Sequence, residues 1–163
     1  MNRLWSIFFI LIITISCVSC MTKKADKVVV NKSESKLYVM KKGKPLKTYN
    51  VAFGTDPVGH KEREGDGRTP EGEYLLDFKN SKSKFYKSIR VSYPNAYDIA
   101  KATALGFNPG GDIMIHGQPN GKEASTKARQ RFNWTQGCIA VTNKEMDEIW
   151  HLIDVGTPIE ILS

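Results

Sequence analysis

The residues best suited to chemistry are a cysteine and a histidine that lie 22 positions apart in the chain. Cys138 follows Gly137 in the stretch FNWTQGCIAV, and it is the sole cysteine beyond position 20. His116 directly follows the apolar run Ile113 to Ile115, which predicts a buried strand that ends at this histidine. A catalytic cysteine needs a base that takes its proton, a group that orients the base, and N–H donors for the oxyanion. The pair therefore predicts nucleophilic acyl transfer at a thiol, with the imidazole within hydrogen-bonding reach of the sulfur.

Glycines beside both residues favour this interpretation. Gly137 lets the backbone turn tightly, so that the amides of Gln136, Gly137 and Cys138 would face one point as an oxyanion hole. Gly117 has no side chain and lets other backbone approach His116. The alternative is a buried and inert Cys138, because an unpaired cysteine in an oxidising compartment is either protected or reactive.

The other two histidines do not suit the role of base. His60 lies among charged residues in a glycine-rich segment, so we expect it on the solvated surface. His151 is off the apolar stripe of a predicted helix over residues 143–153, so we expect it on the polar side. Neither histidine nor cysteine recurs at metal-ligand spacing, and we expect no metal and no cofactor.

Three segments, in this order, resemble the L,D-transpeptidase (YkuD-type) catalytic family of bacterial cell-wall enzymes. They are GDGRTPEGEY at Gly65 to Tyr74, IHGQP at Ile115 to Pro119 and TQGCIAV at Thr135 to Val141. The resemblance extends from about Val28 to Leu162 and implies a mostly β, sandwich-like domain with one or two short helices. It also implies attack on the bond between the third residue of a peptidoglycan stem, usually diaminopimelate, and the terminal D-alanine.

The resemblance assigns a role to each matching residue. Cys138 would be the nucleophile and His116 the general base, whose tautomer is fixed by the Gly117 carbonyl. The oxyanion hole would again be the amides of Gln136, Gly137 and Cys138. Thr135 would support the turn and the bound substrate.

Two departures from the family pattern concern the substrate. Gln136 stands where histidine is frequent, and Ala140 stands where many members carry a basic or polar side chain. The gap between His116 and the cysteine is also longer than usual, and it contains Arg129 and Arg131. We hypothesise that one of these arginines replaces the missing cation and binds a stem-peptide carboxylate. The alternative is that both are solvated.

The acceptor of the acyl group decides between several activities at one site. An amine of a second stem gives a 3→3 cross-link, a lipoprotein lysine gives protein attachment, and water gives L,D-carboxypeptidase activity. Hydrolysis of a wall-attached lipoprotein is the reverse of attachment and is a further alternative. A hypothesis of another class is a non-catalytic wall-binding module. We expect a monomer whose partners are stem peptides.

The N-terminal segment predicts export. Arg3 precedes the apolar run Leu4 to Ile15, as in a secretory signal of residues 1–20, and Cys17 or Cys20 could accept a lipid. The alternative is an uncleaved membrane anchor. We therefore expect a periplasmic or envelope protein with a short tether at residues 21–27. The net charge of +7 suits anionic surfaces such as headgroups or wall, and no recognition motif suggests nucleic acid.

The remaining residues must position the site, and their patterns predict one catalytic domain over residues 28–163. Strands are predicted at residues 28–30, 36–40, 47–53, 73–78, 88–93, 113–115, 139–141 and 157–162. Residues 79–84 read as a polar linker. Helices are predicted over 95–105 and 143–153, the second from a capping box of Thr142 and Glu145. This content predicts a mostly β sandwich or partly open barrel, with a functional or mobile loop over residues 54–72.

Overall fold

The computed structural model describes residues 24–121 and 129–163. The predicted signal segment, with Cys17 and Cys20, lies outside these residues, so its cleavage, lipidation or anchoring stays a prediction.

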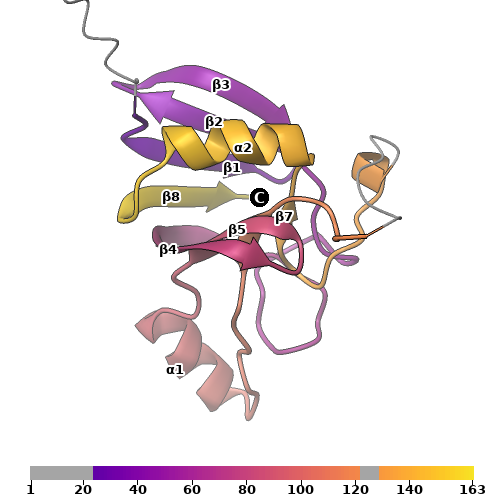
Figure 1. Ribbon diagram of the computed structural model, residues 1–163. Coiled ribbons are helices and arrows are strands. Elements are labelled where there is room, and N and C mark those ends of the chain that lie inside the picture. The colour runs from indigo at the N-terminus through magenta and orange to yellow at the C-terminus, as the bar shows by residue number, and fades with distance from the viewer. Residues whose placement is uncertain (1–23, 122–128) are drawn as a thin grey trace, which may run out of the picture.

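The described residues form one eight-stranded sheet and two α-helices (Figure 1). In spatial order the strands are β3 (Lys44–Asn50), β2 (Lys36–Lys41), β1 (Lys27–Asn31), β8 (Thr157–Leu162), β4 (Gly72–Ser83), β5 (Tyr86–Val91), β6 (Met114–His116) and β7 (Ile139–Ala140). The helices are α1 (Ala96–Ala104) and α2 (Asn143–Leu152), and a short 3-10 helix, η1, spans Arg129–Arg131. Strands β1 and β8 are parallel, as are β6 and β7, and the other pairs are antiparallel. The predicted mostly β class with two helices is confirmed.

The sheet curls until the chain itself joins its two edges. After β3, at one edge, the backbone crosses to β7 at the other edge, where Ala52 and Ala140 form an antiparallel bridge. The N–H of Ala52 donates to the Ala140 carbonyl at 3.0 Å, and the N–H of Ala140 donates to the Ala52 carbonyl at 2.8 Å. A second bridge pairs Gly54 with Thr135. The sequence is compatible with either a sandwich or a partly open barrel. In the structure the strands form a single curled sheet.

Alternating side chains of the central strands make the core inside this curl. Val28 and Val30 of β1 are fully buried, and so are Ile159 and Ile161 of β8 to within about 1%. Successive side chains of a strand point to opposite faces, so the residues between them face outward. The core therefore lies on one face of the sheet, where α2 covers it (Figure 1).

Helix α2 supplies the apolar stripe that the sequence predicts. Met146, Ile149 and the following Ile153 are fully buried in the core. The predicted capping box is present, with Thr142 and Glu145 satisfying each other's backbone N–H groups. This cap fixes the start of α2 two residues after β7, and so helps to hold the strand that follows Cys138.

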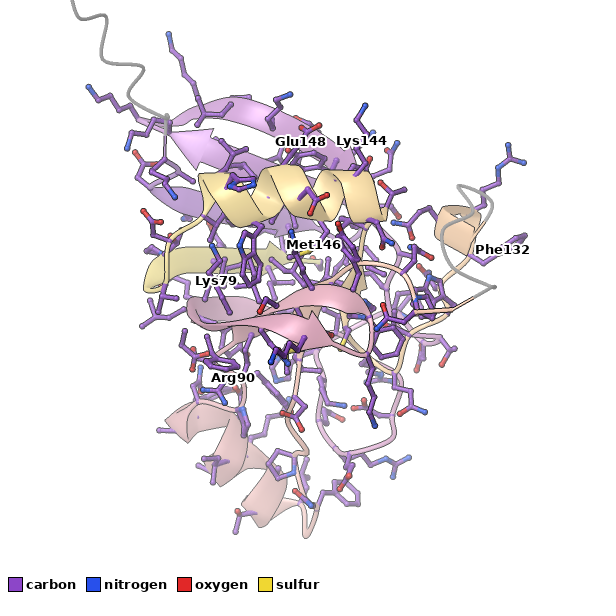
Figure 2. All side chains as sticks on the ribbon, viewed as in Figure 1. Lys79, Arg90, Phe132, Lys144, Met146 and Glu148 are labelled. Carbon is purple, nitrogen blue, oxygen red and sulfur yellow. The ribbon has the colours of Figure 1, made fainter. Side chains whose placement is uncertain are left out.

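The prediction of a polar linker at residues 79–84 is wrong, because β4 continues to Ser83. The chain stays extended there since its partner β5 offers a ladder as far as Tyr86. Lys79 projects under α2 (Figure 2) and donates to the carbonyls of Trp150 at 2.6 Å and Ile153 at 3.0 Å. A cation at these terminal carbonyls stabilises the end of the helix.

Helix α1 lies beyond β4 and β5 (Figure 1) and begins at the capping residue Asn95. The side chain of Asn95 accepts from the N–H of Asp98, and the Asp98 carboxylate accepts from the N–H of Asn95. The predicted helix is therefore confirmed. Over residues 24–121 and 129–163 the helices are too short or too polar to span a membrane.

Candidate active site

Two neighbouring parallel strands bring the predicted nucleophile and base together. In the register of β6 and β7, His116 lies opposite Ala140. Cys138 directly precedes β7, two positions before Ala140. Both residues line one cavity of about 560 Å³, which we call the Cys138 cavity. The structure therefore places the thiol and the imidazole at one site, although the chain separates them.

The imidazole of His116 has a fixed tautomer. Its Nδ1 lies 2.7 Å from the Gly117 carbonyl oxygen, and a carbonyl only accepts, so Nδ1 carries the hydrogen. Nε2 is then left unprotonated and able to take a proton. His116 is buried, with 3% of its surface exposed. Burial lowers the pKa of His116 below 6.5, and the bond to the Gly117 carbonyl offsets only part of this effect.

Gly117 lies where other groups approach the base closely, as the sequence predicts. A Cβ at this position would be 2.6 Å from Oδ1 of Asn143 and 3.0 Å from Cβ of Tyr86. Its N–H donates to the carbonyls of Phe85 at 3.1 Å and Lys87 at 3.2 Å. The glycine therefore lets the β4–β5 hairpin and the start of α2 both contact the residue after His116.

The sulfur of Cys138 points to a backbone carbonyl. Its hydrogen bond goes to the Asp112 carbonyl oxygen at 3.4 Å, whereas the sequence predicts a partner in the imidazole of His116. Catalytic hydrogen bonds often tighten only when substrate binds. Burial raises the pKa of Cys138, the Met114 N–H opposes the rise, and the Asp112 carboxylate adds to it. Lys61 provides a smaller lowering effect on the same pKa.

The turn that presents Cys138 is built on Thr135 and Gly137. The Thr135 hydroxyl donates to the Cys138 carbonyl at 2.8 Å and accepts from the Gly137 N–H at 3.1 Å. Gly137 has φ +117°, and a Cβ there would lie 2.4 Å from the Arg68 carbonyl oxygen. Because Thr135 engages the Gly137 amide in this state, the candidate oxyanion donors are the amides of Gln136 and Cys138.

The two predicted arginines lie on η1. Arg131 is exposed and does not line the Cys138 cavity, while the side chain of Arg129 lies outside what the structure describes. Gln130 fastens η1 to β7, since its Nε2 donates to the Ala140 carbonyl at 2.9 Å. Ala140 is fully buried. Substrate binding by either arginine stays a prediction.

The cation that lines the Cys138 cavity, among the residues that the structure describes, is Lys61. Its ammonium donates to the Asp66 carboxylate at 2.8 Å and to the Arg63 carbonyl at 2.9 Å, and its surface is 3% exposed. Burial alone would raise the pKa of Asp66, but Lys61 and three backbone N–H groups hold it at about 2. The sequence predicts that the loop is functional or mobile, but not that this lysine turns inward.

Two aromatic residues that sequence reasoning missed also line the cavity. Phe85, at the tip of the β4–β5 hairpin, and Trp134, four residues before Cys138, both lie against His116. Phe85 directly follows residues 79–84, which read as a polar linker, so the sequence does not indicate that Phe85 lines the cavity. Phe132, in the same stretch as Trp134, instead projects away from the domain (Figure 2).

His60 is not the solvated surface residue that the sequence predicts. Its Nε2 lies 3.2 Å from the buried Asp98 carboxylate, and its Nδ1 accepts from the Glu71 N–H at 3.1 Å. The Asp98 contact joins the loop to α1, and the Glu71 bond lies within the loop itself. His60 therefore ties the loop over residues 54–72 to α1. Within the described residues, no group of three or more His, Cys, Asp or Glu side chains could hold a metal ion.

The fold and this pair of side chains define a class of protein. The family model of the L,D-transpeptidase catalytic domain, YkuD, matches residues 25–161, and the chain belongs to this family of transferases. Several relatives can be named. The chain is 33% identical over 110 residues to YafK of Escherichia coli (strain K12), a protein provisionally named as an L,D-transpeptidase. That match covers 66% of this chain and 37% of YafK.

Solved structures share the fold. The helical cell shape determining protein Pgp2 of Campylobacter jejuni matches with a TM-score of 0.63 and 26% identity, over 83% of this chain and 46% of Pgp2. The L,D-transpeptidase of Xylanimonas cellulosilytica (residues 123–326) matches with a TM-score of 0.56 and 15% identity, over 86% of this chain and 62% of the other. The second likeness supports the fold alone. The chain thus spans less than half of YafK and of Pgp2.

Proposed function

We propose that the protein is a peptidoglycan L,D-transpeptidase that forms an acyl-enzyme at Cys138. The observation that supports this most directly is that His116, at the end of β6, and Cys138, just before β7, line one cavity. The orientation of the imidazole by Gly117 adds to it. The substrate would be a tetrapeptide stem, because the family acts on peptidoglycan stem peptides.

In the first half-reaction the thiol proton passes to Nε2 of His116 as the sulfur attacks the carbonyl of residue three of the donor stem. A carbon–sulfur bond forms, and the oxyanion receives hydrogen bonds from the amides of Gln136 and Cys138. The carbon–nitrogen bond to D-alanine then breaks. The imidazolium returns its proton to the leaving amine, and a thioester remains on Cys138.

In the second half-reaction an acceptor attacks the thioester while Nε2 of His116 takes its proton. The carbon–sulfur bond breaks and the thiol is restored. An amine of a second stem gives a 3→3 cross-link, a protein lysine gives attachment to the wall, and water gives carboxypeptidase activity. Attack by Cys138 on a lipoprotein–wall bond, followed by water, gives release of the lipoprotein.

We propose that Lys61 shares substrate binding with the arginines of η1. A carboxylate of the stem would reach a cavity wall in which Lys61 already has a fixed position. Two of its three N–H donors have acceptors among the described residues, so its third donor is a candidate for the substrate. Arg129 or Arg131 would act nearer the mouth of the cavity.

We propose the cell envelope as the place of action. The support is the apolar run Leu4 to Ile15 with Cys17 and Cys20, together with a substrate class that lies outside the cytoplasm. A part in cell shape is proposed from the likeness to Pgp2, which is named for that role.

Mass spectrometry of stem products tests the proposal. Purified protein is incubated with a disaccharide-tetrapeptide, alone or with a lysine-containing peptide of a wall-linked lipoprotein. Loss of D-alanine with dimers indicates cross-linking, loss with a peptide adduct indicates attachment, and loss alone indicates carboxypeptidase activity. Cys138→Ala should abolish all three.

The rival of another class, a wall-binding module, makes the opposite prediction. It requires that stem products stay unchanged, that a thiol reagent leaves Cys138 untouched, and that sedimentation with purified wall persists in Cys138→Ala. Those three results together would overturn the enzymatic proposal.

A further inference from the structure

Two aromatic rings enclose His116 with different geometries. The centroid of Phe85 lies 4.6 Å from that of the imidazole, with 35° between the ring planes. Trp134 meets the imidazole edgewise at 5.6 Å and 70°. Phe85 and Trp134 also contact each other, at 6.0 Å. Phe85 is therefore the ring that lies most nearly across the face of the imidazole.

The backbone holds Phe85 in this place. Its carbonyl accepts from the N–H of Gly117, the residue next to His116, and its N–H donates to the Ser83 hydroxyl. The next residue, Tyr86, donates its N–H to the Asn120 side chain at 3.0 Å. The hairpin tip is thus hydrogen-bonded to residues on both sides of it, including the segment that carries the base.

We propose that Phe85 is a positioning residue for His116. The phenyl ring of Phe85 shields the imidazole from water and keeps the plane of the imidazole fixed relative to Cys138. This proposal depends on the proposed function, in which His116 is the base. Phe85 acts through the imidazole, because an apolar ring can neither take nor give the proton. The tilted contact, with the centroids 4.6 Å apart and 35° between the planes, places the Phe85 ring over the imidazole at a separation within the range of paired aromatic rings, as a shielding role requires.

The consequence for titration follows from burial. Loss of the Phe85 ring would let water reach the imidazole, which favours its charged form and raises its pKa. The charged groups that share the cavity with His116 are Lys61, Glu64 and Asp112. On the elements packed beside it, Lys87 is paired with Asp147, and the facing residue of α2 is the neutral Asn143. A substitution at Phe85 leaves these charged groups in place, so a change in the pKa of His116 would be due to the loss of the Phe85 ring.

The experiment follows the imidazole resonances of the full chain by NMR between pH 4 and pH 9, about the range in which histidine titrates. The three histidines are assigned from His60→Gln, His116→Gln and His151→Gln spectra. We expect the pKa of His116 to rise toward 6.5 in Phe85→Leu and to stay low in Phe85→Tyr, which keeps the ring. Phe78→Leu is the matched control, because Phe78 is an exposed aromatic of the same hairpin.

Unchanged titration of His116 in a folded Phe85→Leu protein would overturn the proposal. The resonances of His60 and His151 report whether the fold is kept. If Phe85→Leu does not fold, Phe85→Met carries the same expectation, since it keeps apolar volume without a flat ring. No stem peptide is present, so failure of this test is distinct from failure of the proposed function.

Kinetics then separates positioning from direct substrate contact. We expect Phe85→Leu to lower kcat by about tenfold or more, as for a misplaced catalytic group, with KM little changed and Phe85→Tyr close to wild type. A raised KM with unchanged kcat and unchanged His116 titration would instead make Phe85 a substrate-contact residue and overturn the positioning role.

Discussion

The ammonium of Lys61, a residue that lines the Cys138 cavity, lies 2.8 Å from the carboxylate of Asp66, and both side chains are nearly fully buried. Removing one member of a buried ion pair leaves the other charge without a partner. We therefore expect Lys61→Met to lower the free energy of unfolding by about 3 kcal/mol, measured by chemical denaturation. Lys24→Met is the control, because Lys24 pairs with Asp154 on the exposed surface and should cost under about 1 kcal/mol. Equal losses in the two variants would contradict the prediction.

The substrate role of the cations is tested with the same donor stem. We expect Lys61→Arg, which keeps the charge and the ion pair, to retain a KM close to wild type. Arg129→Ala and Arg131→Ala should each raise KM several-fold if one of them binds a stem carboxylate, since a charged hydrogen bond contributes about 1.5 to 3 kcal/mol. Unchanged KM in both alanine variants would remove the arginines from substrate binding.

The pH dependence of turnover follows from the lowered pKa of His116. The imidazole acts as a base only when neutral, and burial lowers the pKa at which it becomes charged below 6.5. We therefore expect the acid limb of kcat/KM to fall below pH 6.5, and activity to persist through neutral pH. A limb at or above pH 6.5 in the wild-type enzyme would contradict this.

The same shift has a sign for stability. At pH values between the folded and the unfolded pKa of His116, the unfolded chain binds one more proton than the folded protein. The contribution of the neutral, buried imidazole to the free energy of unfolding is therefore fully present above about pH 6.5 and is lost as the pH falls through the folded pKa. His116→Gln should flatten that part of the stability curve, measured by urea denaturation at several pH values.

A substitution at Gly137 tests the geometry of the turn that presents Cys138, which we call the thiol turn (residues 135–138). We expect Gly137→Ala to lose nearly all activity, because its Cβ would lie 2.4 Å from the Arg68 carbonyl oxygen. Gly156→Ala is the matched control, since Gly156 also has a positive φ, at +91°, but has no atom within 4 Å of an added Cβ. That variant should remain active and lose only about 1 kcal/mol of stability. Steady-state rates measure the activity of both variants, and chemical denaturation measures their free energy of unfolding.

Thr135 offers a finer test of the same turn. Thr135→Val keeps the shape of the side chain but removes both hydroxyl hydrogen bonds. We therefore expect the free energy of unfolding to fall by about 1 to 3 kcal/mol. We also expect iodoacetamide to alkylate Cys138 more slowly. Thr135→Ser should behave like the wild type. Identical alkylation rates in all three proteins would argue against a role for this hydroxyl.

The meeting of Cys138 and His116 at one cavity could be predicted from the sequence, and so could the elements that carry strong local signals. Cys138 and His116 stand beside glycines, and the Thr142 capping box marks the start of α2 before any packing is known. These signals are local, so tertiary contacts do not alter them.

The remaining features depend on contacts between distant segments. His60 reads as solvated because its neighbours in the chain are charged, but Asp98 provides a buried partner. Likewise, nothing near Lys61 in the sequence indicates that it turns inward to pair with Asp66. Phe85 follows a polar run that only the pairing of β4 with β5 makes into a strand. No periodicity in the sequence reports such partners.

The bridge between Ala52 and Ala140 also bears on when the nucleophile becomes usable. It joins segments far apart in the chain, and closing so long a loop is entropically costly and slow. We expect the thiol turn to be among the last parts to gain protection in hydrogen-exchange pulse labelling during refolding. A nascent chain would then carry an unassembled turn at Cys138 until the residues on both sides of this bridge are complete.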